Sequence, residues 1–258
     1  FGIKISEMYG IKSPLWGGFK SVADGIKFMQ KNSDKAFVYK PNDSHNYLTT
    51  VPKWDEPKKM NEKLQKNIES LGINDFILQE MKKGVEVNVE VFAVNGEPKT
   101  AHCGLETKRA TSGDCGCMIG CSTDLCFNID LESKLVKMTV GKLFKMIKEM
   151  KYTGFCDINC IICEDEAWFI EWCWRPGYNF HPNYFNNVSK DGFIDVACDM
   201  IDGKYQPKIN TGIFGASVTL WVDHPHKGLI IDIPEDLKKQ VYLFDGYKNE
   251  KGDLCMSG

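Results

Sequence analysis

The most regular hydrophobic pattern in the chain lies between residues 85 and 91. Valine occupies every second position there, and Glu86, Asn88 and Glu90 stand between the valines. A repeat of two is typical of a β-strand that buries one face. Asn95-Gly96 follows and predicts a tight hairpin turn, with residues 98–106 as the returning strand. A second hairpin is expected from strands at 154–163 and 168–173 around the acidic turn at 164–166.

Helices are predicted where the spacing of apolar residues changes to that of a helical face. The first runs from Ser21, which can cap it, to about residue 32, and the second covers 58–71 with Gly72 ending it. A long amphipathic helix is expected over 132–151, and a short one over 194–201.

Further strands are predicted at 36–40, 75–80, 216–222 and 241–244, and a glycine- and cysteine-rich loop at 111–123. Because strands and helices are mixed, hairpins are frequent and strict βαβ alternation is absent, the fold class is predicted to be α+β.

The amino-acid composition makes nucleic-acid-binding and membrane proteins less consistent with this sequence. The 258 residues include 43% hydrophobic and 26% charged residues, and 32 basic against 35 acidic side chains give a formal charge of −3. That balance favours neither a nucleic-acid partner nor a membrane surface. No apolar run reaches the roughly 18 residues of a membrane helix. We expect a cytoplasmic protein. The absence of an initiator Met suggests that the sequence is a piece of a longer chain.

Eleven cysteines are too irregularly spaced for a disulfide framework in a chain of this size, which favours reduced, buried thiols. The group at 115, 117, 121 and 126, with His102 and Cys103 upstream, leaves a structural metal site as an alternative. His181 and the pair at 224 and 226 have no partner placed by sequence. Turn and surface roles are predicted for them.

Candidate chemistry begins at the end of the strand at 36–40. Lys40 can place an ammonium on nucleotide phosphates, and Glu80-Met81-Lys82, between two strands, can present backbone groups to adenine. Glu86 can accept ribose hydroxyls. Each has a plainer alternative, as a solvated strand-end lysine, an ordinary connector or an exposed strand glutamate.

The second hairpin offers hard oxygen ligands. Asn159 and Glu171 face each other if the register allows, and Asp157 shares the face of Asn159. Such ligands suit Mg²⁺, and Arg175, just beyond the strand, suits a phosphate or carboxylate. The alternative is a polar, solvated sheet face.

These segments occur in an order that resembles the ATP-grasp superfamily, most of all glycinamide ribonucleotide synthetase (phosphoribosylamine–glycine ligase). The similar stretches are 9–14, 37–40, 77–86, 107–109 with 113–120, 152–155 and 171–177. The resemblance extends from about residue 8 to 205, with a fainter continuation to 245.

The resemblance implies an ATP-dependent carboxylate–amine ligase that acts through an acyl phosphate, with ATP and Mg²⁺ as cofactors. It assigns Lys40 to the phosphates, Glu80, Met81 and Lys82 to adenine, and Glu86 to ribose. Glu171 becomes a metal ligand. Lys108, Arg109 and Arg175 are placed near the substrate and the transferred phosphoryl group.

The same resemblance implies two lobes, at 1–82 and 83–212, and a partial β-rich segment at 213–258. The family's N-terminal Rossmann-like domain has no counterpart here and is expected as a missing domain or a separate subunit. Residues 41–48 lack the family's glycine-rich lid, and Cys173 replaces its metal-binding Asn. A degenerate ATP-grasp protein that binds nucleotide or a partner without turnover is therefore the alternative.

Overall fold

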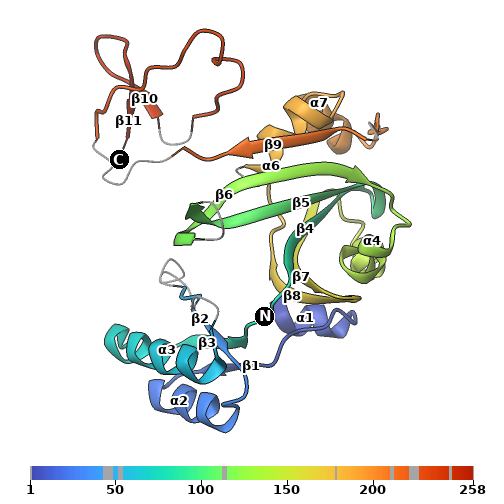
Figure 1. Ribbon diagram of the computed structural model, residues 1–258. Coiled ribbons are helices and arrows are strands. Elements are labelled where there is room, and N and C mark those ends of the chain that lie inside the picture. The colour runs from blue at the N-terminus through green and yellow to red at the C-terminus, as the bar shows by residue number, and fades with distance from the viewer. Residues whose placement is uncertain are drawn as a thin grey trace. The chain divides into compact units, whose positions relative to one another are not determined.

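The fold was analysed in a computed structural model (Figure 1), which describes residues 2–42, 49–51, 55–111, 115–177, 179–209, 212–220, 227–243 and 246–257. Two compact units are present, residues 1–217 and 218–258. Helices and strands are mixed, which confirms the α+β class. Within the described ranges, no helix combines the length and the apolar character needed to cross a bilayer.

The first part of unit 1 is a three-stranded antiparallel sheet in the order β1-β3-β2, formed by β1 (Trp16–Phe19), β2 (Phe37–Pro41) and β3 (Phe76–Glu80). Helices α2 (Val22–Lys31) and α3 (Pro57–Leu71) cover one face (Figure 1). Ser21 caps α2 by accepting the Asp24 N–H, and Gly72 ends α3 with φ of 62°, as the sequence predicted. The core between sheet and helices includes Phe37, Tyr39, Leu64 and Phe76.

The second part of unit 1 is a six-stranded sheet in the order β8-β7-β4-β5-β6-β9. Its strands are β4 (Val85–Val94), β5 (Glu97–Thr111), β6 (Cys115–Ile129), β7 (Gly154–Cys163), β8 (Glu166–Trp172) and β9 (Phe214–Val218). Both predicted hairpins are present, as β4–β5 and β7–β8.

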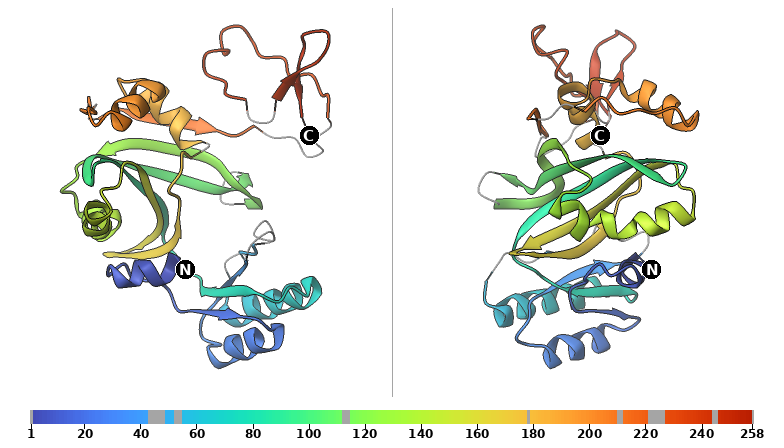
Figure 2. Two further views of the ribbon diagram at one scale, coloured as in Figure 1. Left: turned by 180° about the vertical axis from the view of Figure 1, so that it is seen from behind. Right: turned by 90° about the vertical axis from the view of Figure 1, so that its right-hand side faces the viewer.

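Each face of this sheet has its own apolar core. One face packs against α1 (Gly2–Met8), α4 (Lys134–Met138), the short helix η2 (Val140–Leu143) and α5 (Phe144–Glu149). The strands curve around the helical segment at 134–149 (Figure 2). The other face packs against α6 (Phe180–Asn183), the π-helical turn η3 (Tyr184–Val188) and α7 (Phe193–Ile201). The odd-numbered positions of β4 belong to the first core, so its even-numbered side chains point to the second face.

The predicted helix over 132–151 is wrong in its continuity, because α4, η2 and α5 replace it. The chain leaves helical geometry at Thr139, with φ of −117° and ψ of −116°, and the Thr139 hydroxyl donates to Leu135 O at 2.6 Å. Gly141 then passes so close to α4 that a Cβ there would lie 2.6 Å from Val136 O. Periodicity alone does not register such a break.

The predicted loop at 111–123 is also wrong where it is described. From Cys115 onward the chain forms β6 and pairs with β5, with register shifts between Thr107 and Thr111. Gly116 and Gly120, with φ of 84° and 89°, lie where the pairing is irregular. The glycines that suggested a loop therefore serve a bulged strand.

Unit 2 contains a two-stranded sheet of β10 (Gly246–Lys248) and β11 (Leu254–Met256). The strand expected at 241–244 is absent from the described residues 241–243 and is replaced by β10. The strand expected at 216–222 is found as β9, shifted toward the N-terminus, and residues 221 and 222 lie outside the described part.

Candidate functional site

Lys40, on β2, reaches the edge strand of the six-stranded sheet. Its Nζ donates to Gln79 Oε1 at 2.8 Å and to Ile170 O at 3.2 Å. Burial lowers the pKa of Lys40, while the nearby carboxylates of Glu171 and Glu86 act in the opposite direction. The structure therefore brings Lys40 close to two acids that the sequence analysis placed at a nucleotide. Gln79 strengthens the junction, since its amide donates to Phe169 O at 3.2 Å.

Glu86, on β4, lies beside Lys108, on β5. The Lys108 Nζ is 3.5 Å from Glu86 Oε1 and also pairs with Glu106. Burial raises the pKa of Glu86, whereas Lys108 lowers it. Burial alone would lower the pKa of Lys108, but the Glu86 and Glu106 carboxylates outweigh it and the pKa is raised. Lys108 is therefore a fixed positive charge between two acids, and Glu86 interacts electrostatically with both Lys108 and Lys40.

Asn159 and Glu171 are direct cross-strand partners in β7 and β8, and a register shift between Asn159 and Cys160 provides the register that the prediction left open. Asn159 Nδ2 lies 3.4 Å from Glu171 Oε1. Asp157 points to the same side of β7 and is only 6% exposed. Among the described residues, neither Asn159 Oδ1 nor Asp157 Oδ1 has a hydrogen-bond partner.

These oxygens are of the kind that binds Mg²⁺. Mg²⁺ takes hard oxygen ligands and is commonly held by one or two carboxylates with substrate phosphates. Glu171, Asn159 and Asp157 supply such oxygens, and the two unpartnered atoms have lone pairs to give. Burial, together with Glu90 and Glu106, raises the pKa of Asp157 well above its usual value, a condition that a nearby cation would relieve. The described residues contain no group of three His, Cys, Asp or Glu side chains placed for a metal. The donor set therefore fits a metal shared with phosphates rather than a closed protein site.

Cys173 lies two residues after Glu171, directly beyond the end of β8, and its N–H donates to Asp157 O at 3.0 Å. Burial is the main cause that raises the pKa of its thiol to about 12. A neutral thiol is a poor Mg²⁺ ligand. Arg175 is exposed two residues further on, and its Nη1 donates to Pro176 O at 3.2 Å.

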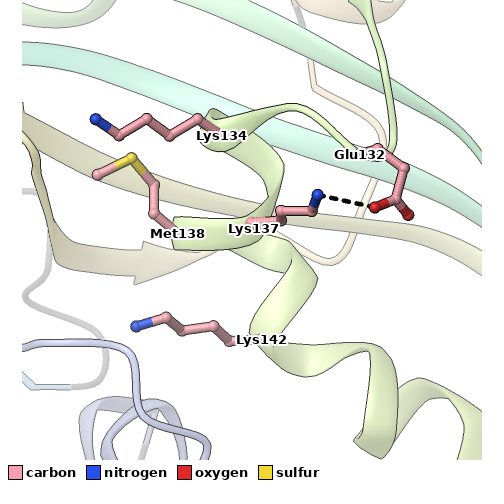
Figure 3. A pocket seen from close by; sticks show the side chains of 5 residues that line it. All are labelled: Glu132, Lys134, Lys137, Met138 and Lys142. Atoms are coloured by element: carbon pink, nitrogen blue, oxygen red, sulfur yellow. Dashed lines mark ion pairs between the residues drawn. The ribbon is translucent and has the colours of Figure 1, made fainter.

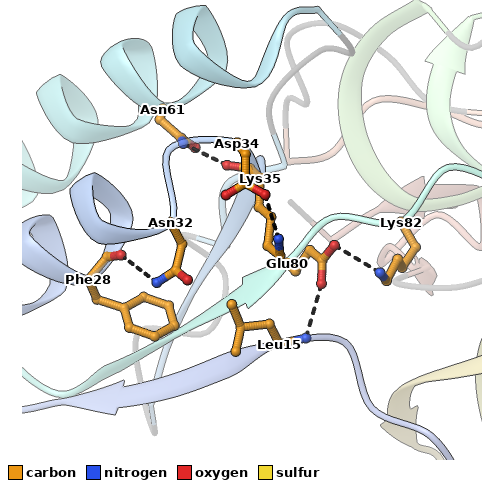
Figure 4. A network of polar contacts seen from close by, with 8 residues as sticks. All are labelled: Leu15, Phe28, Asn32, Asp34, Lys35, Asn61, Glu80 and Lys82. Carbon is orange, nitrogen blue, oxygen red and sulfur yellow. Dashed lines mark hydrogen bonds and ion pairs between the residues drawn. The ribbon is translucent and has the colours of Figure 1, made fainter.

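The connector between β3 and β4 is held by its own side chains (Figure 4). The Glu80 carboxylate accepts the Leu15 N–H at 3.2 Å and the Lys82 Nζ at 2.8 Å. The Met81 N–H donates to Ala36 O at 2.8 Å, which fixes the backbone at Met81. Lys82 Nζ lies 4.2 Å from the centre of the Trp168 ring. A connector fixed in this way presents its remaining backbone groups in a defined direction.

Arg109 is oriented differently from its neighbour Lys108. Its Nη1 donates to Gly116 O at 2.9 Å and its Nη2 to Val51 O at 3.3 Å. It therefore joins the β5–β6 hairpin to the segment at 49–51. The stretch at 43–48, where the sequence differs from the glycine-rich lid, lies outside the described residues.

A buried ionisable cluster was missed by the sequence analysis. Glu90, His102 and His181 are 1%, 0% and 5% exposed. The surface role predicted for His181 is therefore wrong, because α6 packs it against the sheet. The sequence does contain a signal for this cluster, because the alternation along residues 85–91 places Glu90 on the same face of the strand as Glu86.

The cysteines agree with reduced thiols wherever their side chains are described, since ten of them are free. They do not form a metal cluster in those parts of the chain. His224 and His226 lie outside the described residues.

A surface hollow of about 410 Å³ lies elsewhere, around α4 (Figure 3). It is lined by Glu132, Lys134, Lys137, Met138 and Lys142, none of which is a candidate site residue. Its lysines already have partners, since Lys134 pairs with Asp165, Lys137 with Glu132, and Lys142 donates to Gly10 O. The hollow therefore contributes nothing to the candidate site.

Comparison with known proteins extends this picture. No family model matches the chain, and no curated protein matches it. Solved structures do match. Phosphoribosylamine–glycine ligase from Thermotoga maritima aligns with a TM-score of 0.72 and 19% identity, over 100% of this chain and 68% of that one. The chain has the ATP-grasp fold.

Other ATP-grasp ligases give the same result. L-amino acid ligase from Bacillus licheniformis has a TM-score of 0.58, 14% identity and coverage of 89% of this chain. N5-carboxyaminoimidazole ribonucleotide synthetase from Thermus thermophilus has a TM-score of 0.60, 12% identity and coverage of 88%. The chain spans 54% and 61% of these two proteins. It is therefore structurally similar to carboxylate–amine ligases of the ATP-grasp class over part of their length.

Proposed function

We propose that this chain is the ATP-grasp core of an ATP-dependent carboxylate–amine ligase that acts through an acyl phosphate, similar to glycinamide ribonucleotide synthetase. The observation that carries the proposal is the meeting of Lys40 with Glu171 and Glu86 at the junction of the two sheets. A buried ammonium beside two acids suits a triphosphate with its metal. The lobes proposed for this role are residues 1–82 and 83–212.

Each candidate residue is proposed to bind a different part of the nucleotide or its metal. The connector at 80–82 binds adenine through its backbone, and Glu86 accepts the ribose hydroxyls. Lys40 neutralises phosphate charge as the terminal phosphoryl group moves. Glu171 and Asn159, with Asp157 behind them, would hold Mg²⁺, which when bound neutralises charge on the phosphate oxygens.

The reaction joins two small molecules. A substrate carboxylate attacks the terminal phosphorus of ATP, giving an acyl phosphate and ADP. The neutral amine then attacks the acyl carbon, the carbon–oxygen bond to phosphate breaks, and an amide, phosphate and the proton lost by the amine are released. Arg175, Lys108 and Arg109 are proposed to orient the carboxylate and the transferred phosphoryl group, so that catalysis rests on positioning and charge. Glycine, named in the Thermotoga maritima ligase, is the first carboxylate to try.

The test is ADP release with ATP, Mg²⁺ and pooled amino acids, with and without phosphoribosylamine. We expect amine-dependent ADP release from the wild-type chain and a loss of about 100-fold or more in Glu171→Gln. The matched control is Glu62→Gln, which makes the same change at an exposed position of α3. Equal activity in wild type and Glu171→Gln would contradict the proposal.

A second candidate function is nucleotide binding without turnover. Cys173 supports it, because a neutral thiol stands where the resembling family has a metal-binding Asn. In that case, calorimetry detects ADP binding that depends on Lys40, and no combination of substrates releases ADP.

A further inference from the structure

His181 links the segment after β8 to the centre of the six-stranded sheet. Its Nδ1 accepts the backbone N–H of Gly177 at 2.5 Å. An imidazole nitrogen that accepts carries no proton, so the ring proton lies on Nε2. That nitrogen faces Glu90 Oε1 at 3.2 Å. The ring therefore hydrogen-bonds to a backbone amide beyond β8 and lies in electrostatic contact with a buried carboxylate on β4.

Glu90 is confined by its surroundings. Its second oxygen lies 3.8 Å from His102 Nδ1, and His102 Nε2 is 3.1 Å from the Thr100 hydroxyl. Burial acts to raise the pKa of Glu90, but His181 and His102 outweigh it and the pKa is lowered. Glu90 is only 1% exposed, and its contact with His181 is electrostatic, because neither Glu90 Oε1 nor His181 Nε2 has a hydrogen-bond partner among the described residues. This attraction favours the ring orientation that keeps Nε2 beside the carboxylate.

The aromatic neighbours restrict the ring further. Phe155 lies 5.0 Å from the His181 ring and Phe92 lies 6.3 Å from it in a stacked arrangement. The His102 ring packs against the same Phe92, with the ring centres 4.3 Å apart. A ring enclosed in this way cannot turn without displacing the core, so its Nδ1 lone pair keeps a fixed direction.

Arg175 lies midway between two anchor points. Two residues before it, the Cys173 N–H is bound to Asp157 O at 3.0 Å. Two residues after it, the Gly177 N–H is bound to His181. The Arg175 backbone is therefore held from both sides, and His181 supplies the second hold.

We propose that His181, oriented by Glu90, is a positioning residue that fixes Gly177 and thereby sets Arg175 for its work on the substrate or phosphoryl group. The proposal rests on the proposed function of Arg175 for its catalytic part. Its structural part, the anchoring of Gly177, stands on the contacts alone.

Two substitutions separate the two sides of the ring. His181→Asn places an amide oxygen where Nδ1 lies, so it keeps an acceptor for Gly177 and gives up the contact with Glu90. His181→Gln reaches the place of Nε2, so it keeps a donor for Glu90 and gives up the acceptor for Gly177. We therefore expect His181→Asn to be the less stable but more active variant, and His181→Gln to be the more stable but less active one.

The first measurement is hydrogen exchange at the Gly177 amide, with urea unfolding of both variants. We expect exchange in His181→Gln to be at least 10-fold faster than in His181→Asn, although His181→Asn is the less stable variant. Exchange that follows overall stability, or that is equal in the two, overturns the anchoring of Gly177.

The second measurement is ADP release under the conditions that test the ligase. We expect kcat in His181→Gln to fall about 100-fold below that in His181→Asn, with KM for ATP similar, because misplacing a catalytic group by an ångström costs about that much. Activity that falls in parallel with stability overturns the catalytic part. A wild-type chain that releases no ADP contradicts the proposed function instead, and the exchange pattern still decides whether His181 anchors Gly177.

Discussion

Asp124 shows at the scale of one residue how burial determines chemistry. It is 2% exposed on β6, and its Oδ2 accepts from Asn183 at 3.2 Å. Its Oδ1 has no hydrogen-bond partner in the described part of the chain. Burial is the largest cause that raises its pKa to about 6, and the bond from Asn183 only partly opposes it. The folded protein therefore holds this proton more tightly than the unfolded chain does.

The sign of the pH dependence follows directly. Because the folded pKa is above the ordinary value of 3.8, the charged form costs stability, and that cost develops as the pH rises from about 4 through 6. Asp124→Asn keeps the shape and removes the charge. We expect its free energy of unfolding, measured in urea, to exceed that of the wild type by about 2–3 kcal/mol at pH 7.5, with the difference vanishing toward pH 3. A difference independent of pH would contradict this account.

At the scale of one element, β5 depends on a missing side chain. Gly104 pairs with Asn88 on one side and Cys126 on the other. A Cβ at Gly104 would lie 1.8 Å from Asn88 Oδ1 and 3.1 Å from Asp124 Oδ1. Asn88 is 3% exposed, so its side chain has no free space to move into. Because Gly104 has no side chain, the buried side chains of Asn88 and Asp124 can extend over this part of β5.

Gly104→Ala is therefore expected to destabilise the protein by about 1–3 kcal/mol, because a methyl group must displace Asn88 within a packed layer. Urea unfolding measures this change. Gly18→Ala on β1 is the matched control, since a Cβ there meets nothing within 4 Å. If Gly104→Ala lowers the free energy of unfolding no more than Gly18→Ala does, the Asn88 side chain can move aside without loss of stability.

At the scale of unit 1, the two sheets are connected where the nucleotide is proposed to bind. Lys40 and Gln79, from the three-stranded sheet, hydrogen-bond to the backbone of β8 at Ile170 and Phe169. A nucleotide that engages Lys40 and the hairpin of Glu171 contacts both sheets. Its binding energy should therefore add to the free energy of unfolding of the whole unit.

We expect Mg²⁺ and ADP at about 100 times the dissociation constant to raise the free energy of unfolding by about 2.7 kcal/mol. Lys40→Met should weaken ADP binding by about 10- to 100-fold, because it removes a charged hydrogen-bond donor, and should lose most of that stabilisation. The control is Lys31→Met at an exposed position of α2. Calorimetry and thermal unfolding measure both effects, and equal ADP affinity in Lys40→Met and wild type would exclude Lys40 from the site.

The sequence by itself determined the local elements and several cross-strand pairs. Alternation along 85–91, the Asn95-Gly96 turn, the Ser21 cap and Gly72 are local signals, because each depends on a few neighbouring residues. The predicted hairpin left the facing of Asn159 and Glu171 open, because the register shift between Asn159 and Cys160 that brings them opposite each other is not visible in the sequence. The order of such segments also resembled a family whose fold the chain has.

Tertiary structure alone decided which polar residues are buried and what they touch. Alternation put Glu86, Asn88 and Glu90 on one face, but helices α6 and α7, about 90 residues later in the chain, determine that Glu90 is enclosed and Glu86 is not. The pairing of Glu90 with His181 and the break at Thr139 likewise depend on contacts between distant segments. Burial and electrostatics are sums over all neighbours in space, so a pattern read along the chain cannot supply them.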